Sequence, residues 1–306
     1  MHYIEENIQA LFDFAIERQK VYYKKEVLKS NPPWTEDFTL KTYLFCNVRR
    51  QNDRLTKVYI DLTKKMLAED FSKQEILLNT YLYRIFNTEN FFEVFGLLNI
   101  KNFLLPSHLT NLIQKSEYKQ KAFPVWGTAY QTSPNMMYLY KSKIKSSRYI
   151  HNAYDMFKDG EFLAITNNIS LRQNVSQCLE ALKALPGVGP FLSQQIFNDL
   201  TYIPGYLNGN MNINEFVNAG PGCPGTSEFI RGSSFSKYEN VVEDIHYIYG
   251  TQNKYLKNYE SIMGLDYTLK TPEIRLSDLE HLFCEFRKYL NLKAGIGKKR
   301  YYKGKV

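Results

Sequence analysis

The chain has 306 residues and a formal net charge of +8, with 44% hydrophobic and 23% charged residues. This composition excludes a disordered chain, and the length is enough for one large or two intimate domains with a sizeable core. The positive charge indicates a polyanionic partner such as DNA, and no apolar run approaches the roughly 20 residues of a membrane span.

Helical periodicity dominates the chain, and strand-type alternation is scarce. An apolar stripe predicts a first helix over 3–28, which ends before Pro32, and Thr35 is the expected N-cap of the next helix. Residues 123–140 should form turns and a short helix, and 203–236 an irregular, glycine-rich stretch. Further helices are predicted over 36–46, 53–66, 73–86, 90–97, 107–115, 145–158, 160–167, 171–184, 188–201, 238–260 and 274–291.

These elements predict an all-α fold. We expect a single helical domain over 1–292, or two lobes at about 1–150 and 151–292, followed by a basic tail over 293–306. The tail interleaves basic residues with tyrosines, which suits DNA. Its expected DNA contacts are Lys298, Lys299 and Arg300, and a frayed, solubilising terminus is the alternative.

The four cysteines, Cys46, Cys178, Cys223 and Cys284, are far apart in the sequence and form no C-x-x-C pair. A zinc ribbon or an iron–sulfur loop is therefore not expected, and we predict no metal and no cofactor. Without a secretory signal, free thiols in a reducing compartment are expected. The predicted location is intracellular, in the cytoplasm of a bacterium or of a phage host, or in the nucleus of a eukaryote.

The most specific local pattern is residues 185–196, LPGVGPFLSQQI, which lies between two predicted helices. Gly187 and Gly189 allow a tight turn, and Pro190 suits the first position of the second helix. The amides of Gly187, Val188 and Gly189 can then meet a phosphate oxygen, which positions a DNA backbone without reading its sequence. An ordinary turn between two helices is the alternative.

Several further motifs occur in a fixed order: 18–23 (RQKVYY), 33–36 (PWTE), 47–56 (NVRRQNDRLT), 83–87 (YRIFN), 128–130 (TAY), 197–200 (FNDL), 215–223 (EFVNAGPGC) and 278–289 (DLEHLFCEFRKY). Together they resemble the α-glutamyl/putrescinyl-thymine pyrophosphorylase family and the related helical domain of 5-hydroxymethyluracil DNA kinases. The resemblance covers about residues 15–290. It implies a helix-hairpin-helix fold like that of DNA glycosylases.

The resemblance also implies an enzyme of phage-type thymine hypermodification that acts on a flipped base of double-stranded DNA. An amine co-substrate, an amino acid or a polyamine, would displace pyrophosphate from 5-pyrophosphoryloxymethyl-uracil. The chain contains no G-x-x-x-x-G-K-[ST] string, so a hydroxymethyluracil DNA kinase is the expected partner for phosphorylation.

Such a transfer needs a receptor for a polyanionic leaving group and an acceptor for the proton of the amine. The predicted catalytic residues are Asp53, Arg54, Arg84, Asn87, Glu215, Glu280, His281 and Glu285. Arg49 and Arg50 are assigned to DNA binding. The pocket for the base and the leaving group is assigned to Trp34, Asn52, Phe86, Tyr130, Gly220 and Gly222.

Each assignment has a structural alternative. The arginines of 49–54 could form a solvated face, and Arg84 and Asn87 could be caps or buried partners. His281 and Glu285 could be an ordinary helix pair, for which the sequence identifies no further metal ligands. Trp34 could be a core plug, the Gly220–Gly222 loop a simple turn, and Cys284 a small buried hydrophobe.

Two other functions remain open, a mono-functional glycosylase for a modified base and a non-catalytic DNA-binding module that serves a kinase. The hairpin resembles that of DNA glycosylases, whose bifunctional members carry a lysine at the position of Phe191. Lyase chemistry is therefore not expected here. Glycosylases of this kind also carry an aspartate about 20 residues after the hairpin. In this chain that window holds Asn208, Asn210, Asn212 and Asn214, and its acidic residue is Glu215.

Overall fold

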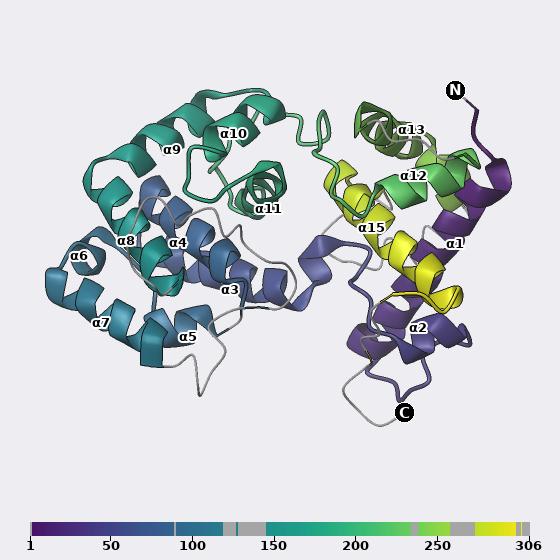
Figure 1. The fold of residues 1–306 in the computed structure, drawn as a ribbon, viewed down its shortest axis with the longest axis horizontal. Helices are drawn as coiled ribbons and strands as arrows, with labels where there is room; N and C mark the ends of the chain where they lie inside the picture. The colour runs from purple at the N-terminus through teal and green to yellow at the C-terminus, as the bar shows by residue number, and fades with distance from the viewer. Residues whose placement is uncertain are drawn as a thin grey trace. The chain divides into compact units, whose positions relative to one another are not determined.

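The computed structural model describes residues 2–88, 90–118, 127, 145–233, 238–257, 273–297 and 301. Helices dominate these residues, and no sheet strand occurs among them (Figure 1). A single antiparallel bridge joins Tyr43 to Tyr301. The predicted all-α fold is thus confirmed, while the glycosylase-like arrangement stays a prediction. No helix in the described part of the chain is both long enough and apolar enough to cross a bilayer.

The helices are α1 (Glu5–Tyr22), η1 (a π-helix, Tyr23–Val27), α2 (Phe38–Thr42), η2 (a 3₁₀ turn, Arg50–Asn52), α3 (Arg54–Ala68), α4 (Lys73–Phe86), α5 (Phe91–Phe95), α6 (Ile100–Phe103), α7 (Pro106–Tyr118), α8 (Lys145–Lys158), α9 (Glu161–Leu171), α10 (Val175–Leu182), α11 (Pro190–Leu200), α12 (Pro224–Arg231), α13 (Tyr238–Leu256) and α15 (Leu276–Lys293).

The chain folds into two compact units. Unit 1 combines Met1–Asp53 with Phe216–Val306, and unit 2 is Arg54–Glu215. The division suggested near residue 150 coincides with neither boundary, because Ile150 lies within α8. The first unit is therefore assembled from both ends of the chain.

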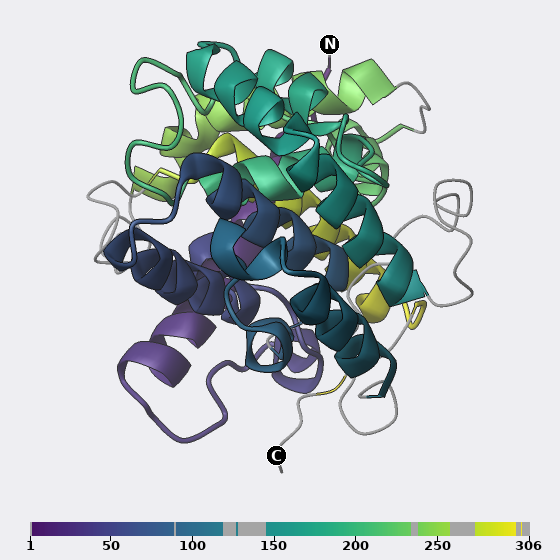
Figure 2. The same cartoon turned by 90° about the vertical axis from the view of Figure 1, so that its left-hand side faces the viewer.

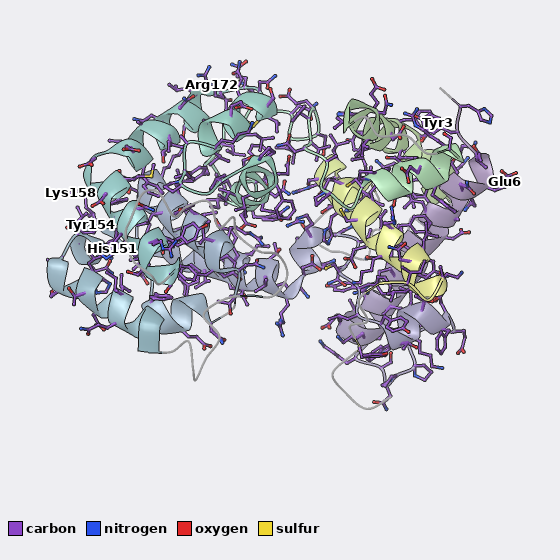
Figure 3. All side chains as sticks on the ribbon, in the orientation of Figure 1. Tyr3, Glu6, His151, Tyr154, Lys158 and Arg172 are labelled. Atoms are coloured by element: carbon purple, nitrogen blue, oxygen red, sulfur yellow. The ribbon has the colours of Figure 1, made fainter. Side chains whose placement is uncertain are left out.

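Unit 2 is built around α4, which packs against α8, α9 and α11 (Figure 2). All residues of α4 from Glu75 to Phe86 are buried, so the helix is surrounded on every side. Asn79 satisfies its buried amide by donating to the carbonyls of Glu75 and Leu98 and by accepting from the amide of Leu98. On α8, His151, Tyr154 and Lys158 follow one another along the helix (Figure 3).

Unit 1 is built around α15, which contacts α1, α2, α12 and α13. Apolar side chains of these helices form one core, with Leu279, Phe283 and Phe286 contributed by α15. Tyr3, near the start of the chain (Figure 3), donates its hydroxyl to Asp244 at 2.8 Å. Arg231 pairs with the same carboxylate, which fastens α12 to α13.

Local capping explains where several predicted helices begin and end. Asp37, not Thr35, caps α2, because its carboxylate accepts from the Leu40 amide while Thr35 accepts from Asp37. Extended backbone at Tyr43 ends α2 well before residue 46. The prediction of an irregular stretch over 203–236 was wrong in its second half, because α12 occupies Pro224–Arg231.

Candidate functional site

The turn between α10 and α11 has the local structure that the glycine pattern predicts. Leu185, Val188, Leu192 and Ile196 are all buried and hold the two helices together. Gly187 has a φ of 71°, a left-handed conformation that favours glycine. Tyr81 of α4 donates its hydroxyl to the Pro186 carbonyl at 2.9 Å and so fixes the turn to the centre of unit 2.

The amides of this turn divide into two groups. The Val188 amide donates to the Leu185 carbonyl at 3.1 Å, so it is not available to a ligand as the sequence suggested. Within the described residues, the amides of Gly187 and Gly189 donate to no protein acceptor. Phe191 follows them with 37% of its surface exposed. The Gly187 and Gly189 amides at the N-terminus of α11 can therefore receive an anion.

In unit 1, four chemically active side chains come together, and we call them the polar cluster: Cys46, Asp53, His281 and Glu285. Asp53 Oδ2 lies 3.7 Å from His281 Nε2. The Asn47 amide donates to Asp53 Oδ1 at 2.8 Å, and the Cys46 amide donates to Glu285 Oε2 at 2.9 Å. His281 and Glu285 share a face of α15, as the sequence predicted. Cys46 was not predicted.

Desolvation controls the charges of the polar cluster. Burial raises the pKa of Asp53 to about 6. Burial also raises the pKa of the Cys46 thiol well above its usual value, and the negative charges of Glu285 and Asp53 nearby raise it further. Burial opposes ionisation of Glu285 too, but Lys288 and His281 beside it hold its pKa below the ordinary value. The cluster thus combines an imidazole with acidic groups in a partly buried site, in which Cys46 is exposed.

A second group lies on the neighbouring face of α15. Cys223 Sγ is 3.5 Å from Cys284 Sγ and 3.5 Å from Glu280 Oε1, and the Gly220 amide donates to the same Glu280 oxygen at 2.9 Å. Burial raises the pKa of Glu280. The predicted loop of Gly220 and Gly222 therefore packs on α15, and the Gly220 amide is occupied by a protein carboxylate.

Replacing Gly222 by alanine should destabilise unit 1 by about 1–3 kcal/mol, because the new methyl group would overpack the contact with α15. Its Cβ would lie 2.9 Å from Cys284 Sγ and 3.3 Å from Cys284 Cα. Gly250 in α13 is the control, since a Cβ there meets nothing within 4 Å. Gly250→Ala should stabilise the helix by up to about 1 kcal/mol. Free energies of unfolding in urea check both, and the same sign for the two variants would contradict the packing argument.

Three predicted catalytic residues of unit 2 have structural partners. Arg84 is buried and forms a two-pronged ion pair with buried Asp199. Asn87 ends α4 in a left-handed conformation, and the Glu215 carboxylate accepts from the Val175 amide at the start of α10. The positions of Arg84 and Asn87 match their structural alternatives, and the catalytic roles of all three residues stay predictions.

Burial also bears on the predicted DNA contacts of unit 1. Arg49 is 0% exposed and Arg50 6% exposed, so a phosphate could not reach either guanidinium without rearrangement, and the assignment to DNA does not fit. Arg49 Nη1 instead donates to the Glu273 carbonyl at 2.9 Å, and the Arg50 amide donates to Asp278 at 2.9 Å. Asn52 is buried beside them.

The remaining predicted residues are not members of the polar cluster, or they fall outside the described residues. Trp34 is half-buried, donates Nε1 to the Ser30 carbonyl at 2.8 Å and has the Lys25 ammonium over its ring. Phe86 is buried in unit 2, and exposed Arg54 begins α3 there. Tyr130, Lys298, Lys299 and Arg300 fall outside the residues that the structure describes.

A groove of about 520 Å³ opens on unit 1, between α1, α2, α12 and α15. Its lining combines the aromatic rings of Phe14, Phe286 and Tyr289 with the carboxylates of Asp13 and Glu17. Rings and carboxylates of this kind attract cations. The ammonium groups of Lys20 and Lys293 line the groove as well, and none of the polar cluster lines it.

Three residues with evident roles were missed by sequence reasoning: Asp199, Cys46 and Cys223. Asp199 lies in the FNDL motif and Cys223 ends the EFVNAGPGC motif. Cys46 directly precedes the NVRRQND motif. Their positions next to motifs were the available signal, and their partners lie too far away in the sequence to be identified from spacing.

Comparisons with known proteins identify the family of the chain. The family of 5-hmdU DNA kinase helical domains matches residues 5–298. The chain is 26% identical over 301 residues to a 5-hmdU DNA kinase of Bacillus phage SP10, which covers 94% of this chain and 46% of the relative. The chain thus spans less than half the length of that relative. No solved structure gives a significant match. This chain belongs to the family of 5-hmdU DNA kinase helical domains.

Proposed function

We propose that the chain is a transferase of DNA base modification, which displaces pyrophosphate from 5-pyrophosphoryloxymethyl-uracil in DNA with an amine. The observation that carries the proposal is the polar cluster of Cys46, Asp53, His281 and Glu285, gathered in a partly desolvated part of unit 1. Membership of a family named for a 5-hmdU DNA kinase supports DNA with a 5-substituted uracil as the substrate class. An amino acid or a polyamine is the proposed second substrate.

The reaction forms one bond and breaks one. The amine nitrogen attacks the exocyclic methylene carbon, the C–O bond to pyrophosphate breaks, and pyrophosphate leaves with the bonding electron pair. The amine must then lose a proton, for which a carboxylate within hydrogen-bond reach is needed. Asp53 and Glu285 offer such carboxylates in the polar cluster. Low local polarity strengthens their interaction with the developing ammonium ion.

The turn between α10 and α11 is the proposed grip on the DNA backbone. Its Gly187 and Gly189 amides can donate to a phosphate oxygen, and glycine lets that oxygen approach closely. Such contacts position a duplex but do not select its sequence. Selection of the modified base is therefore assigned to the site of the chemistry.

The test is incubation of the chain with duplex DNA that carries the activated base, together with candidate amines, followed by mass spectrometry of the nucleosides. A thymidine heavier by the amine supports the proposal. Asp53→Asn should slow its formation by about 100-fold or more, whereas the exposed Glu180→Gln should have no effect. A released base with an abasic site would establish a glycosylase instead.

A second candidate is a non-catalytic DNA-binding module that serves a kinase. The observation in its favour is that the chain matches 46% of a protein named as a DNA kinase, while its own sequence has no G-x-x-x-x-G-K-[ST] string. In the same experiment, DNA that is bound but chemically unchanged with every amine would favour this module over the transferase.

A further inference from the structure

We propose that the polar cluster is a binding site for a divalent transition metal ion, zinc by its donor set, held by Cys46 Sγ, Asp53 Oδ2 and His281 Nε2. The sequence led us to expect no metal, because it identified no ligands to join His281 and Glu285. The fold supplies them from the segment of residues 46–53. Metal binding itself rests on the geometry of unit 1, and only its catalytic use rests on the proposed function.

The spacing of the three ligand atoms fits one ion. The thiol, carboxylate and imidazole atoms all lie within 4.8 Å of one another. Asp53 Oδ2 and His281 Nε2 are 3.7 Å apart, which is too long for a hydrogen bond. An oxygen and a nitrogen bound to one tetrahedral zinc ion, with bonds of about 2.0–2.2 Å, lie about 3.3–3.5 Å apart, so a small movement of either side chain would bring this pair to that distance. Sulfur, imidazole nitrogen and carboxylate oxygen are the donors that zinc takes in proteins.

Neighbouring hydrogen bonds already orient the ligands. The Asn47 amide binds Asp53 Oδ1 at 2.8 Å, which leaves Oδ2 toward His281. The Cys46 amide holds Glu285 Oε2 at 2.9 Å, next to the thiol residue. Outer contacts of this kind fix the ligands of protein metal sites. Glu285 is thereby placed to complete the coordination or to leave a fourth position open for a substrate oxygen.

The charges of the site also favour a cation. Two carboxylates, a thiol and an imidazole lie close together here, and their donor atoms can be drawn onto one divalent ion. The basic groups close to them are Lys288, which pairs with Glu285 at 3.2 Å and donates to the Leu44 carbonyl, Arg18, which donates to the Cys46 carbonyl, and buried Arg50. Lys288 and Arg18 are each held by another partner.

A metal here would do what buried Arg49 and Arg84 cannot. The proposed leaving group, pyrophosphate, is a polyanion, yet Arg49 and Arg84 are buried against protein groups. A zinc ion held by Cys46, Asp53 and His281 would supply a Lewis acid for the charge of a phosphoryl oxygen. If the proposed reaction holds, Asp53 is then a ligand, and Glu285 is left to accept the amine proton.

The test uses the full chain, stripped with a chelator and titrated with Co²⁺. One equivalent should bind and produce visible d–d bands of a tetrahedral ion with a near-ultraviolet thiolate-to-cobalt band. Cys46→Ser should abolish the thiolate band, and both Cys46→Ser and His281→Gln should weaken Zn²⁺ binding, measured by calorimetry, by at least about 100-fold, since outer contacts alone change affinity 10–100-fold. Cys178→Ser, a buried thiol of unit 2, is the matched control and should change nothing.

Two results would overturn the assignment. One is a chain that binds neither Co²⁺ nor Zn²⁺. The other is a thiolate band that survives in Cys46→Ser but disappears in Cys223→Ser, which would move the ion to Cys223, Glu280 and Cys284. Metal binding by a chain that makes no modified nucleoside would support the site and count against the proposed reaction. Amine transfer by fully stripped protein would support the proposed reaction and overturn the catalytic use of the ion.

Discussion

Replacing Asp199 by alanine should destabilise unit 2 by about 3–5 kcal/mol, because it leaves the Arg84 guanidinium as an uncompensated buried charge. The side chains of Arg84 and Asp199 are 4% and 1% exposed, and two nitrogens of the guanidinium bind the two oxygens of the carboxylate. The pair joins α4, the central helix of unit 2, to α11. Urea unfolding followed by circular dichroism should show the loss as an earlier transition.

Two controls separate the buried pair from charge in general. Glu180→Ala removes an exposed partner of Lys183, where the carboxylate side chain is 70% exposed, and should cost about 0–1 kcal/mol. The double variant Arg84→Met with Asp199→Leu should recover most of the loss, since apolar replacement of a buried pair is often neutral. If Asp199→Ala and Glu180→Ala unfold alike, the ion pair does not hold the unit together.

Helix positions were predictable where periodicity and caps agree. The prediction over 73–86 coincides with α4, because Ser72 and Glu75 form a capping box at its start and Asn87 takes the left-handed conformation at its end. The prediction over 145–158 coincides with α8. Local sequence carries all the information that such boundaries need.

α12 was missed for a physical reason. Glycines at 220, 222, 225 and 232 make its surroundings look irregular in the sequence. In the structure Pro224 begins the helix and Gly232 ends it in a left-handed conformation, as helix ends commonly do. Gly225 lies within the helix against Arg287 of α15, where a larger residue would collide. Gly225 is needed for the packing of α12 against α15, and the local sequence alone does not predict such a contact.

The candidate site was predictable in part. His281 and Glu285 follow from their spacing on one helix, and Asp53 was singled out within its motif. That Cys46 and Asp53 meet His281 could not be predicted, because unit 1 joins the two ends of the chain around an inserted second unit. The burial of Arg49 could not be predicted either, because arginine is seldom buried. The Glu273 carbonyl that accepts its hydrogen bond is 224 residues away in the sequence.

Gly189→Asp should weaken binding of duplex DNA by about tenfold or more, while the fold stays intact. Gly189 is the N-cap of α11, its φ is −97°, and a Cβ there meets nothing within 4 Å, so aspartate fits. Aspartate is also a favoured N-cap, so the melting temperature should hold or rise. Its carboxylate, however, would place a negative charge beside the amides proposed for the phosphate and repel it, and a charged hydrogen bond contributes about 1.5–3 kcal/mol. Fluorescence anisotropy at one fixed salt concentration measures the affinity.

Matched variants separate the effect of the charge of the new side chain from the effects of its shape and its position. Gly189→Asn gives the same shape and cap without the charge, so it should bind DNA more tightly than Gly189→Asp and less tightly than the parent chain. Gly209→Asp adds the same charge at an exposed glycine of unit 2 with open space around it, and should lower affinity only by the general effect of net charge. Equal affinities of Gly189→Asp and Gly209→Asp would mean that the amides at the start of α11 do not hold the phosphate. If only Gly189→Asp loses affinity for DNA and its melting temperature is not lowered, unfolding does not explain the loss. The contact with the DNA backbone would then lie at this turn.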